Sequence, residues 1–351
     1  MANFVFNDVG ISGISATVPK NISRNIDMAG FIPKEEIEKT INSIGIIEKR
    51  FVDADTCASD LCFSAAEKLI AEMNIDRTTI DVLIFMSQTP DYKIPATAPI
   101  LQNRLRLSKN TAAFDVGLAC SGYVYSLSIA FAYASLPGIN RILLLDGETF
   151  TKIVNPRDKV NAPLYGDAGS ATIIEKGNFG QSYFSLNTDG SGFEAIKINA
   201  GGYRNMSNSE NIIEQTDKEG NVRSEHQIYM DGGEVFNFTM REIPRDIKNI
   251  LAISNTNLEG IDYLVFHQAN KFMTDFFSKK LKLPVNKVPY CLDKFGNTSS
   301  SSIPLTISSE LYAILKNTRK KIMISGFGAG LSWGTAILDL NNCKVIQVFE
   351  V

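Results

Sequence analysis

The feature that most limits the fold is a weak internal repeat, seen when the two halves of the chain are compared. The segment DVLIFMSQT, which begins at Asp81, resembles DYLVFHQAN, which begins at Asp262, 181 residues later. RILLL (from Arg141) resembles KIMIS (from Lys321) at a displacement of 180. AFDVGLACSGYVYSLSIA resembles CLDKFGNTSSSSIPLTIS at 178, and GSATII resembles WGTAIL. Because the matches keep one order and nearly one offset, we interpret the chain as two copies of one unit.

Each copy is predicted to alternate strands with helices. The runs VLIF, RILLL and YLVF are continuously apolar, as expected for strands buried on both faces of a parallel sheet. The predicted fold class is therefore α/β, with two duplicated βαβαβ-type halves. We place the first half at residues 1–175 and the second at residues 176–351, with 176–233 as a polar connecting excursion whose part 205–227 lies on the surface.

Two segments of the second half receive specific predictions. Residues 291–294 take the place of the strand at residues 112–116, because Asp293 falls over Asp115 in the repeat. Residues 235–253 have the spacing of an amphipathic helix, and Pro244 inside it predicts a kink or a late start.

Composition narrows the class of protein. The 351 residues carry a net charge of −3, which argues against a general nucleic-acid binder. The five cysteines are an odd number without a CxxC pair, so neither a disulfide framework nor a zinc site is predicted, and a reducing compartment is favoured. The N-terminus does not resemble a signal peptide, and no run reaches the ~18 apolar residues of a membrane span. We therefore expect a cytoplasmic protein with no membrane, nucleic acid or metal ion bound.

A cysteine marks the point where a predicted strand gives way to a helix. The stretch AAFDVGLACSGYVYSLSIAFAYAS, residues 112–135, places Cys120 at the start of the helix. Unpaired N–H groups and the helix dipole favour an anion there, so they are expected to lower the pKa of the thiol. A buried structural cysteine fits the same stretch, because free cysteines are among the most buried residues. This segment alone is compatible with both interpretations.

Two further polar residues occupy related places in the second copy. His267 follows the strand that begins at Tyr263, and Asn297 lies in the turn that corresponds to the Cys120 turn. Functional groups in open parallel sheets lie just beyond the carboxyl ends of the strands, so pseudo-twofold symmetry would bring all three together. Taken alone, His267 fits a satisfied core histidine and Asn297 a turn residue or helix cap. Together with Cys120 they make a nucleophile, a base or hydrogen-bond donor, and an amide.

These motifs resemble those of the thiolase superfamily and, within it, the ketoacyl-acyl carrier protein synthase III type. The matching motifs occur in the family's order: Cys120 in GLACSG, YGDAG, MDGGEVFNF, His267 in HQAN, Asn297 in GNTSSSS, and GFGAGLSWG. The pair HQAN and GNTSSSS separates this type from thiolases, which use a second cysteine. The resemblance covers nearly the whole chain and implies a thiolase-like five-layer αβαβα fold.

The resemblance implies a condensation in two steps. Cys120 would attack an acyl thioester and hold the acyl group. His267 and Asn297 would hydrogen-bond the thioester carbonyl of malonyl-acyl carrier protein and stabilise the enolate that decarboxylation leaves. The backbone N–H groups of Cys120 and Ala329 would form the oxyanion hole, and Phe327 would lie over the malonyl carboxylate. The product would be a 3-oxoacyl-acyl carrier protein, made for fatty acid or specialised acyl-chain biosynthesis.

The resemblance also implies where the substrate binds. In the family a loop from the partner subunit of a dimer closes the acyl pocket; here this loop is residues 89–98, with Ile94 where an aromatic often lies. Gly232 and Lys159 are assigned to substrate binding along with Phe327. No cofactor is predicted, because the phosphopantetheine thioester belongs to the substrate.

The residues at the expected CoA entrance bear on which carrier delivers the acyl primer. Lys39 and Ser43 stand where an adenine-stacking Trp and an Arg are usual in the family, so the primer is expected either on CoA or on acyl carrier protein. Acyl carrier proteins are acidic and would dock on the lysines beside HQAN, although these lysines also fit an ordinary solvated helix face. The predicted docking residues are Lys271, Lys279 and Lys280.

Three functions are compatible with the sequence. The first is a homodimeric, decarboxylating condensing enzyme. The second is an acyltransferase of the same fold that moves an acyl group from Cys120 to an amine or alcohol without decarboxylation. The third is a non-catalytic partner subunit of a ketosynthase heterodimer. The presence of Asn297 favours the condensing enzyme over the acyltransferase. A non-catalytic subunit would be expected to lack the nucleophile, but this chain keeps Cys120.

Overall fold

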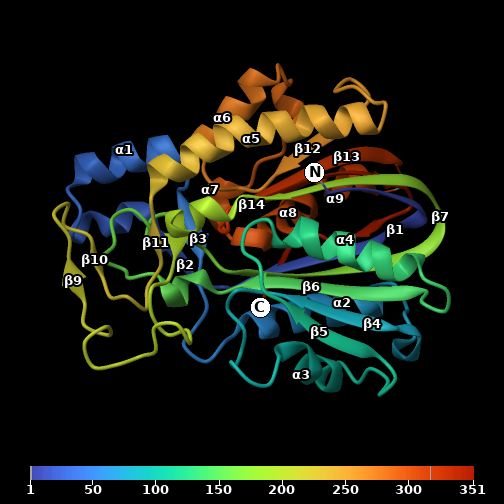
Figure 1. Cartoon of the computed structure of the whole chain (residues 1–351), viewed down its shortest axis with the longest axis horizontal. Coiled ribbons are helices and arrows are strands. Elements are labelled where there is room, and N and C mark those ends of the chain that lie inside the picture. Colours follow the sequence, from blue (N-terminus) through green and yellow to red (C-terminus); the bar gives the residue numbers. More distant parts are fainter. Residues whose placement is uncertain (1, 317) are drawn as a thin grey trace.

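The strands of the protein form one large mixed sheet (Figure 1). The computed structural model describes residues 2–316 and 318–351. The sheet runs in the order β12 (Tyr263–Phe266), β13 (Lys320–Gly328), β14 (Ser332–Leu340), β7 (Ala168–Thr188), β6 (Arg141–Glu148), β4 (Val82–Met86) and β5 (Ala112–Val116). Strand β1 (Ala2–Val18) lies along β7, and β15 (Lys344–Val345) and β16 (Phe349–Glu350) lie along β1. The first part of β7 pairs with β6 and its last part with β14, so this strand runs unbroken from one half of the sheet into the other.

Helices cover both outer faces and fill the middle. In β4, Val82 and Ile84 pack in a cluster with α4 (Gly122–Ser135), whereas Leu83 and Phe85 pack in a cluster with α2 (Ala58–Glu72) and α3 (Thr97–Arg104). The α4 cluster continues through α8 (Ser302–Thr306) to β13 and β14. On the far face of β13, Met323 packs with α5 (Gly232–Ile253) and α6 (Lys271–Lys280). The predicted five-layer αβαβα arrangement is therefore confirmed, and Figure 1 shows α4 between the two parts of the sheet.

The internal repeat is visible in matching hydrogen bonds. Asp81 precedes β4, and its N–H donates to the carbonyl of Arg141 at 2.9 Å, while its carboxylate accepts from the N–H of Arg141 at 3.1 Å. Asp262 precedes β12 and makes the same two contacts with Lys321, at 2.9 and 2.8 Å. Both aspartates thus fasten a strand to its parallel neighbour, β6 or β13. The two halves were predicted to share this unit, and at these strands they do.

The repeat fails at one strand. Residues 291–294 were expected to form the counterpart of β5, but the chain forms the short helix α7 (Leu292–Phe295) instead. Asp115 of β5 accepts two N–H groups at the start of α3, both at 2.7 Å. The equivalent Asp293 lies inside α7, and its backbone carbonyl accepts from the N–H of Ile47. The prediction of a strand is therefore wrong, and the second half has one strand fewer at this edge among the described residues.

Helix α5 is longer and more regular than predicted. It begins at Gly232, where the Asp231 side chain caps it by accepting from the N–H of Glu234 at 3.0 Å. Pro244 lies inside the helix without ending it. Proline has no N–H, so the carbonyl four residues earlier, that of Met240, has no donor within the helix. The ammonium of Lys280 on α6 donates to that carbonyl at 3.0 Å and replaces the missing partner.

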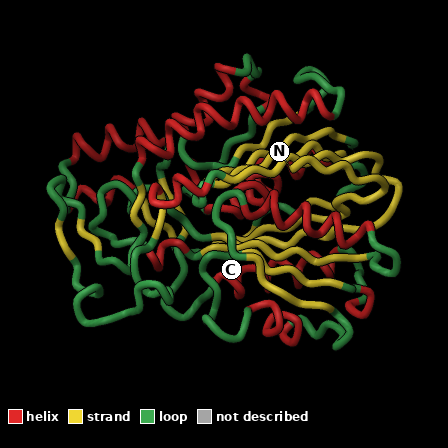
Figure 2. Tube along the Cα trace, in the orientation of Figure 1, coloured by secondary structure: helices red, strands yellow, loops and turns green. Residues whose placement is uncertain are grey.

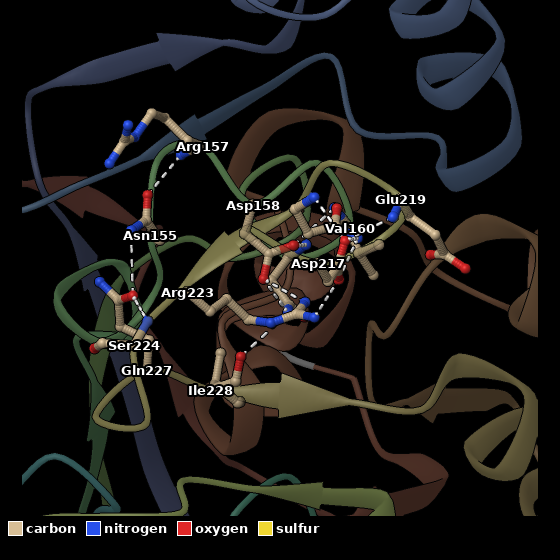
Figure 3. A network of polar contacts seen from close by, with 12 residues as sticks. Asn155, Arg157, Asp158, Val160, Asp217, Glu219, Arg223, Ser224, Gln227 and Ile228 are labelled. Carbon is tan, nitrogen blue, oxygen red and sulfur yellow. Dashed lines mark hydrogen bonds and ion pairs between the residues drawn. The ribbon is translucent and has the colours of Figure 1, made fainter. Parts of the chain in front are cut away.

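Residues 205–227 were predicted to lie on the surface, and most of residues 205–220 are exposed. Residues 221–227 are mainly half-buried, because a polar network holds this part of the excursion (Figure 3). Arg223 donates to the buried Asp158 at 3.0 Å and to Asp217 at 2.8 Å. Asn155 donates to Gln227 at 3.2 Å. These contacts fasten the excursion to the loop that carries Lys159.

The remaining elements are short. Figure 2 shows that much of the region around the excursion is loop rather than helix or strand. None of the helices within residues 2–316 and 318–351 has both the length and the apolar character needed to cross a membrane. The other helices and strands are β2 (Ile22–Arg24), η1 (Asn25–Gly30), α1 (Lys34–Ile44), β3 (Glu48–Arg50), η2 (Arg77–Thr79), η3 (Phe150–Ile153), η4 (Gly190–Ala195), β8 (Ile196–Lys197), β9 (Gln215–Thr216), β10 (Val222–Arg223), β11 (Tyr229–Met230), η5 (Val285–Lys287), η6 (Ser299–Ser301), η7 (Ile307–Leu311) and α9 (Tyr312–Leu315).

Candidate active site

Cys120 lies in the turn between β5 and α4, two residues before the helix begins. The residue is buried, with 7% of its surface exposed. The hydroxyl of Ser299, from the second half of the chain, donates to its Sγ at 3.5 Å. The end of β13 also comes close, because a Cβ atom added at Gly328 would lie 3.0 Å from this Sγ. The Cys120 turn of the first half is therefore enclosed by two segments of the second half.

His267 follows β12 directly and is also buried. Its Nδ1 lies 2.8 Å from the hydroxyl oxygen of Ser302, and that hydroxyl is within 2.7 Å of the carbonyl of Ser299. A hydroxyl can donate to or accept from Nδ1, so this contact is compatible with either tautomer of the neutral ring. The ring of Phe327 stands edge-on to the imidazole, with 5.4 Å between the ring centroids.

Asn297 lies in the turn after α7, and its amide is oriented by the backbone. Its Oδ1 accepts the N–H of Ser299 at 2.9 Å. Its own N–H donates to the carbonyl of Leu164 at 2.8 Å, which ties the turn to the loop before β7. Because the oxygen is used in this way, the amide N–H₂ group is left as the donor that can meet a substrate.

The structure thus brings the three predicted residues to one buried site. Cys120, His267 and Asn297 come from three separate turns, and each is linked to Ser299 directly or through Ser302. Pseudo-twofold symmetry alone would not have specified this connection. It depends on a serine for which the sequence analysis had no assignment.

Burial controls the charge state of the site. Burial raises the pKa of the Cys120 thiol to about 12; the Ser299 hydrogen bond opposes the shift, and the carboxyl groups of Glu148 and Asp146 add to it. Burial lowers the pKa of His267 to about 3. The expectation that the helix start lowers the thiol pKa is therefore wrong for the protein without substrate, because loss of solvation outweighs the helix dipole. At neutral pH the site holds a neutral thiol beside a neutral imidazole.

The raised thiol pKa predicts how alkylation depends on pH. Between about pH 7 and pH 9 the rate of Cys120 modification by iodoacetamide should rise about tenfold per pH unit, because the thiolate fraction does so at any pH well below the pKa. Mass spectrometry of the Cys120 peptide measures the rate, and the half-buried Cys57 in the same samples provides a comparison. A plateau below pH 8 for Cys120 would contradict the charge state described above.

The turn after β13 carries Ala329, whose N–H was predicted to form an oxyanion hole with that of Cys120. The hydroxyl of Ser332 lies 2.7 Å from that of Ser121, next to Cys120, and 2.8 Å from the carbonyl of Ala329. These contacts tie the Ala329 turn to the Cys120 turn. Cys120 and Ala329 lie outside the helices and strands, and among the described residues neither N–H donates to a backbone carbonyl. The assignment of both N–H groups to an oxyanion hole stays a prediction.

Comparisons with known proteins decide the family. A family model described as 3-Oxoacyl-[acyl-carrier-protein (ACP)] synthase III matches residues 114–190, and the model of its C-terminal part matches residues 251–340. A putative 3-oxoacyl-[acyl-carrier-protein] synthase 3 of Campylobacter jejuni is 35% identical over 347 residues, covering 96% of this chain and 95% of the relative. The chain belongs to the 3-oxoacyl-acyl carrier protein synthase III family.

Two further comparisons agree with membership of the synthase III family. A beta-ketoacyl-[acyl-carrier-protein] synthase III of Clostridioides difficile is 32% identical and covers 94% of this chain and 97% of its own length. The crystal structure of a 3-oxoacyl-(acyl-carrier protein) synthase from Burkholderia xenovorans superposes with a TM-score of 0.93 at 34% identity, covering 100% of this chain and 99% of that one. The thiolase-like fold predicted from the motifs is thus shared with solved structures.

The residues assigned to substrate binding by resemblance to the synthase III family differ in whether they contact the site around Cys120. Phe327 contacts the His267 ring, and its predicted place over the malonyl carboxylate stays a prediction. Ile94 lies on the loop before α3 and is 81% exposed. Gly232 is the first residue of α5, and Lys159 lies half-buried beside Gly220 of the excursion. Among the described residues no hydrogen bond joins Ile94, Gly232 or Lys159 to the catalytic turns, so their assignment stays a prediction.

The predicted docking lysines differ in their surroundings. Lys280 already serves α5 by donating to Met240, and its ammonium also lies over the Phe276 ring at 5.3 Å. Lys271 pairs with Asp275 in the next turn of α6. Lys279 is exposed at the end of α6. All three lysines are exposed, and a hydrogen bond to a carbonyl leaves the charge of Lys280 in place, so Lys271, Lys279 and Lys280 stay predicted docking residues.

The functional contacts that sequence reasoning missed come from the serine run. Residues 299–302 are four serines in succession, and all of them are at most 1% exposed. A buried hydroxyl must find a hydrogen-bond partner, so a buried serine run indicates a dense local network. The run was used only as a family motif, although four successive serines between apolar segments were visible in the sequence.

Proposed function

We propose that this chain catalyses a decarboxylating condensation between an acyl group held on Cys120 and malonyl-acyl carrier protein, which gives a 3-oxoacyl-acyl carrier protein. The observation that carries the proposal is the Asn297 amide, whose oxygen accepts the N–H of Ser299, the residue that also contacts Cys120. Among the described residues its N–H₂ group makes no hydrogen bond, so it can donate to a substrate. Donors held in place for a developing negative charge suit an enolate. The names of the relatives support the same reaction.

In the first step Cys120 takes the acyl group. Neutral His267 accepts the thiol proton while Sγ forms a bond to the carbonyl carbon of the primer thioester. The N–H groups of Cys120 and Ala329 donate to the tetrahedral oxyanion. When the old carbon–sulfur bond breaks, the departing sulfur recovers the proton from His267. The imidazolium and the oxyanion form together and disappear together, so the site is neutral before and after the step, in agreement with the neutral pair described above.

In the second step the malonyl group loses carbon dioxide and its electron pair stays as an enolate. The enolate oxygen accepts hydrogen bonds from the Asn297 amide and from the His267 ring. In this step the ring is the tautomer with its proton on Nε2, and Nδ1 accepts from the Ser302 hydroxyl. Phe327 keeps water from the departing carboxylate. The enolate carbon then attacks the acyl carbonyl on Cys120. A carbon–carbon bond forms, the Sγ–carbon bond breaks, and the sulfur takes up a proton from solvent.

The substrate supplies its own phosphopantetheine, and the proposed reaction uses no bound cofactor. The carrier protein is proposed to dock beside the HQAN turn, with Lys271, Lys279 and Lys280 meeting its acidic surface. Such contacts are expected to weaken with salt, since charge pairs between exposed groups are screened. We assign the reaction to the cytoplasm, which is supported by five cysteines that are all free.

We propose a homodimer in which a second copy covers the loop of residues 89–98. Tyr92 and Ile94 on this loop are 61% and 81% exposed. Strand β5 is the last strand of the sheet and pairs with β4 alone among the described residues. An apolar loop beside an open strand edge is the kind of surface that a second copy covers.

The test offers the enzyme acyl primers of graded length, on CoA and on acyl carrier protein, followed by malonyl-acyl carrier protein. We expect a mass increase on the Cys120 peptide, followed by a 3-oxoacyl-carrier product extended by two carbons. Ile94 is smaller than the aromatic residue that is common at this position in the family, so primers longer than acetyl should be accepted. Labelling by acetyl alone would remove the Ile94 prediction, and acyl transfer to an added amine without extension would favour the acyltransferase alternative.

A further inference from the structure

One serine contacts the whole catalytic set. Ser299 is completely buried, and each of its three polar groups meets a different part of the site. Its hydroxyl donates to Sγ of Cys120, and its N–H donates to Oδ1 of Asn297. Its carbonyl accepts from Ser302, whose oxygen contacts Nδ1 of His267. Ser299 thus connects all three predicted catalytic residues to one another.

The backbone of Ser299 is specialised for this position. Its φ of +53° lies in the left-handed region, which residues other than glycine rarely adopt. Such conformations persist where the surroundings hold them, and they cluster at functional sites. In the neighbouring serines the hydroxyls point elsewhere: Ser300 donates to Asp146 at 2.6 Å and Ser301 to the carbonyl of Thr298 at 2.8 Å. Within the serine run, only the Ser299 hydroxyl meets the nucleophile.

We propose that Ser299 is a fourth catalytic residue, whose hydroxyl donates a hydrogen bond to Cys120 Sγ and stabilises the thiolate when it attacks and when it leaves. The assignment rests on the proposed function for its place in the reaction. A hydrogen bond to an ionised group is stronger than one to a neutral group, so the donor favours the thiolate over the thiol. The same donor assists the second step, in which Sγ departs from the new 3-oxoacyl product.

The surroundings of Sγ make this donor important. Burial and the carboxyl groups of Glu148 and Asp146 on β6 all oppose ionisation of the thiol, and the Ser299 hydrogen bond is the largest influence in the other direction. Neutral His267 and the buried Tyr165 hydroxyl are the other titratable groups facing this turn. None of these four groups carries a positive charge at neutral pH that could replace the donor.

The experiment compares Ser299→Ala with Ser301→Ala in the full-length protein. Alanine keeps the Cβ and the backbone N–H and removes only the hydroxyl, and Ser301 provides a matched buried serine in the same turn. We expect Ser299→Ala to lower the rate of Cys120 alkylation by iodoacetamide about tenfold at each pH between about 7 and 9, which displaces the profile by about one pH unit. Ser301→Ala should leave the profile in place.

A second measurement separates chemistry from folding. Cys57 lies outside the site, so its alkylation rate should be the same in wild type and Ser299→Ala if the fold is intact. The assignment would be overturned if Cys120 in Ser299→Ala were alkylated at the wild-type rate, or if Ser301→Ala lowered that rate equally. Alkylation needs no malonyl substrate, so the result is independent of the proposed function. If the wild type releases no carbon dioxide yet Ser299→Ala slows alkylation, the reaction assignment fails and the Ser299 contact stands.

Discussion

Replacing Cys120 with serine should abolish the acyl-enzyme and reduce condensation by a factor on the order of 10³ to 10⁴. Burial already raises the pKa of the thiol to about 12, and an alcohol at the same place ionises far less readily. The hydroxyl would fit the space left by sulfur, so the loss would report the nucleophile and not a cavity. Intact-mass measurement after incubation with acyl primer gives the acylated fraction directly.

Cys291→Ser provides the matched control for this prediction. Cys291 is buried in the second half, where its Sγ contacts the hydroxyl of Thr306 at 3.2 Å. The exchange of sulfur for oxygen is the same, but the site lies outside the catalytic turns. We expect acylation within about twofold of wild type, since surroundings that already accept a hydrogen bond suit serine. Full acylation of Cys120→Ser, or loss of acylation only in Cys291→Ser, would mean that another residue is the nucleophile.

Replacing Asn297 with aspartate should separate the two half-reactions. Aspartate retains the oxygen that accepts the Ser299 N–H, so the turn is preserved, but it removes the N–H₂ donor from the enolate. Loss of one donor to a developing oxyanion typically costs about 10² to 10³ in rate, and the added negative charge acts in the same direction. We therefore expect carbon dioxide release to fall by at least about 10²-fold, while acylation of Cys120 stays within roughly threefold.

Asn297→Ala extends this comparison. It removes the acceptor of the Ser299 N–H as well as the donor to substrate, so it should impair both half-reactions. The ratio of acylation to decarboxylation rates, measured with labelled primer and labelled malonyl-carrier, distinguishes the two variants. An equal loss of both rates in Asn297→Asp would show that Asn297 supports the turn and not the enolate.

Several elements could be predicted from the sequence because each depends on local pattern. Strands β5 and β12 lie where their apolar runs predicted them. Asp81 and Asp262 matched in sequence, and they make the same backbone contacts in the structure. The convergence of Cys120, His267 and Asn297 was also predicted, because strand ends of a duplicated parallel sheet meet at one edge.

The features that were not predicted depend on contacts between distant segments. Residues 291–294 have a β5-like place in the repeat, but the turn that follows pairs with the loop at Leu164 and the segment closes into a helix. Pro244 does not interrupt α5, because Lys280 from another helix satisfies the free carbonyl. The thiol pKa was expected to follow the helix dipole, but its burial by both halves decides it. In each case the deciding partner lies more than thirty residues away.

The central claim is that decarboxylation and carbon–carbon bond formation are coupled on Cys120, and one measurement tests it most directly. Malonyl-acyl carrier protein labelled in its free carboxyl group is added to the acylated enzyme, and released carbon dioxide is counted against 3-oxoacyl product. We predict one molecule of carbon dioxide per molecule of product, with both lost in Cys120→Ser. Product or acyl transfer without labelled carbon dioxide would contradict the account.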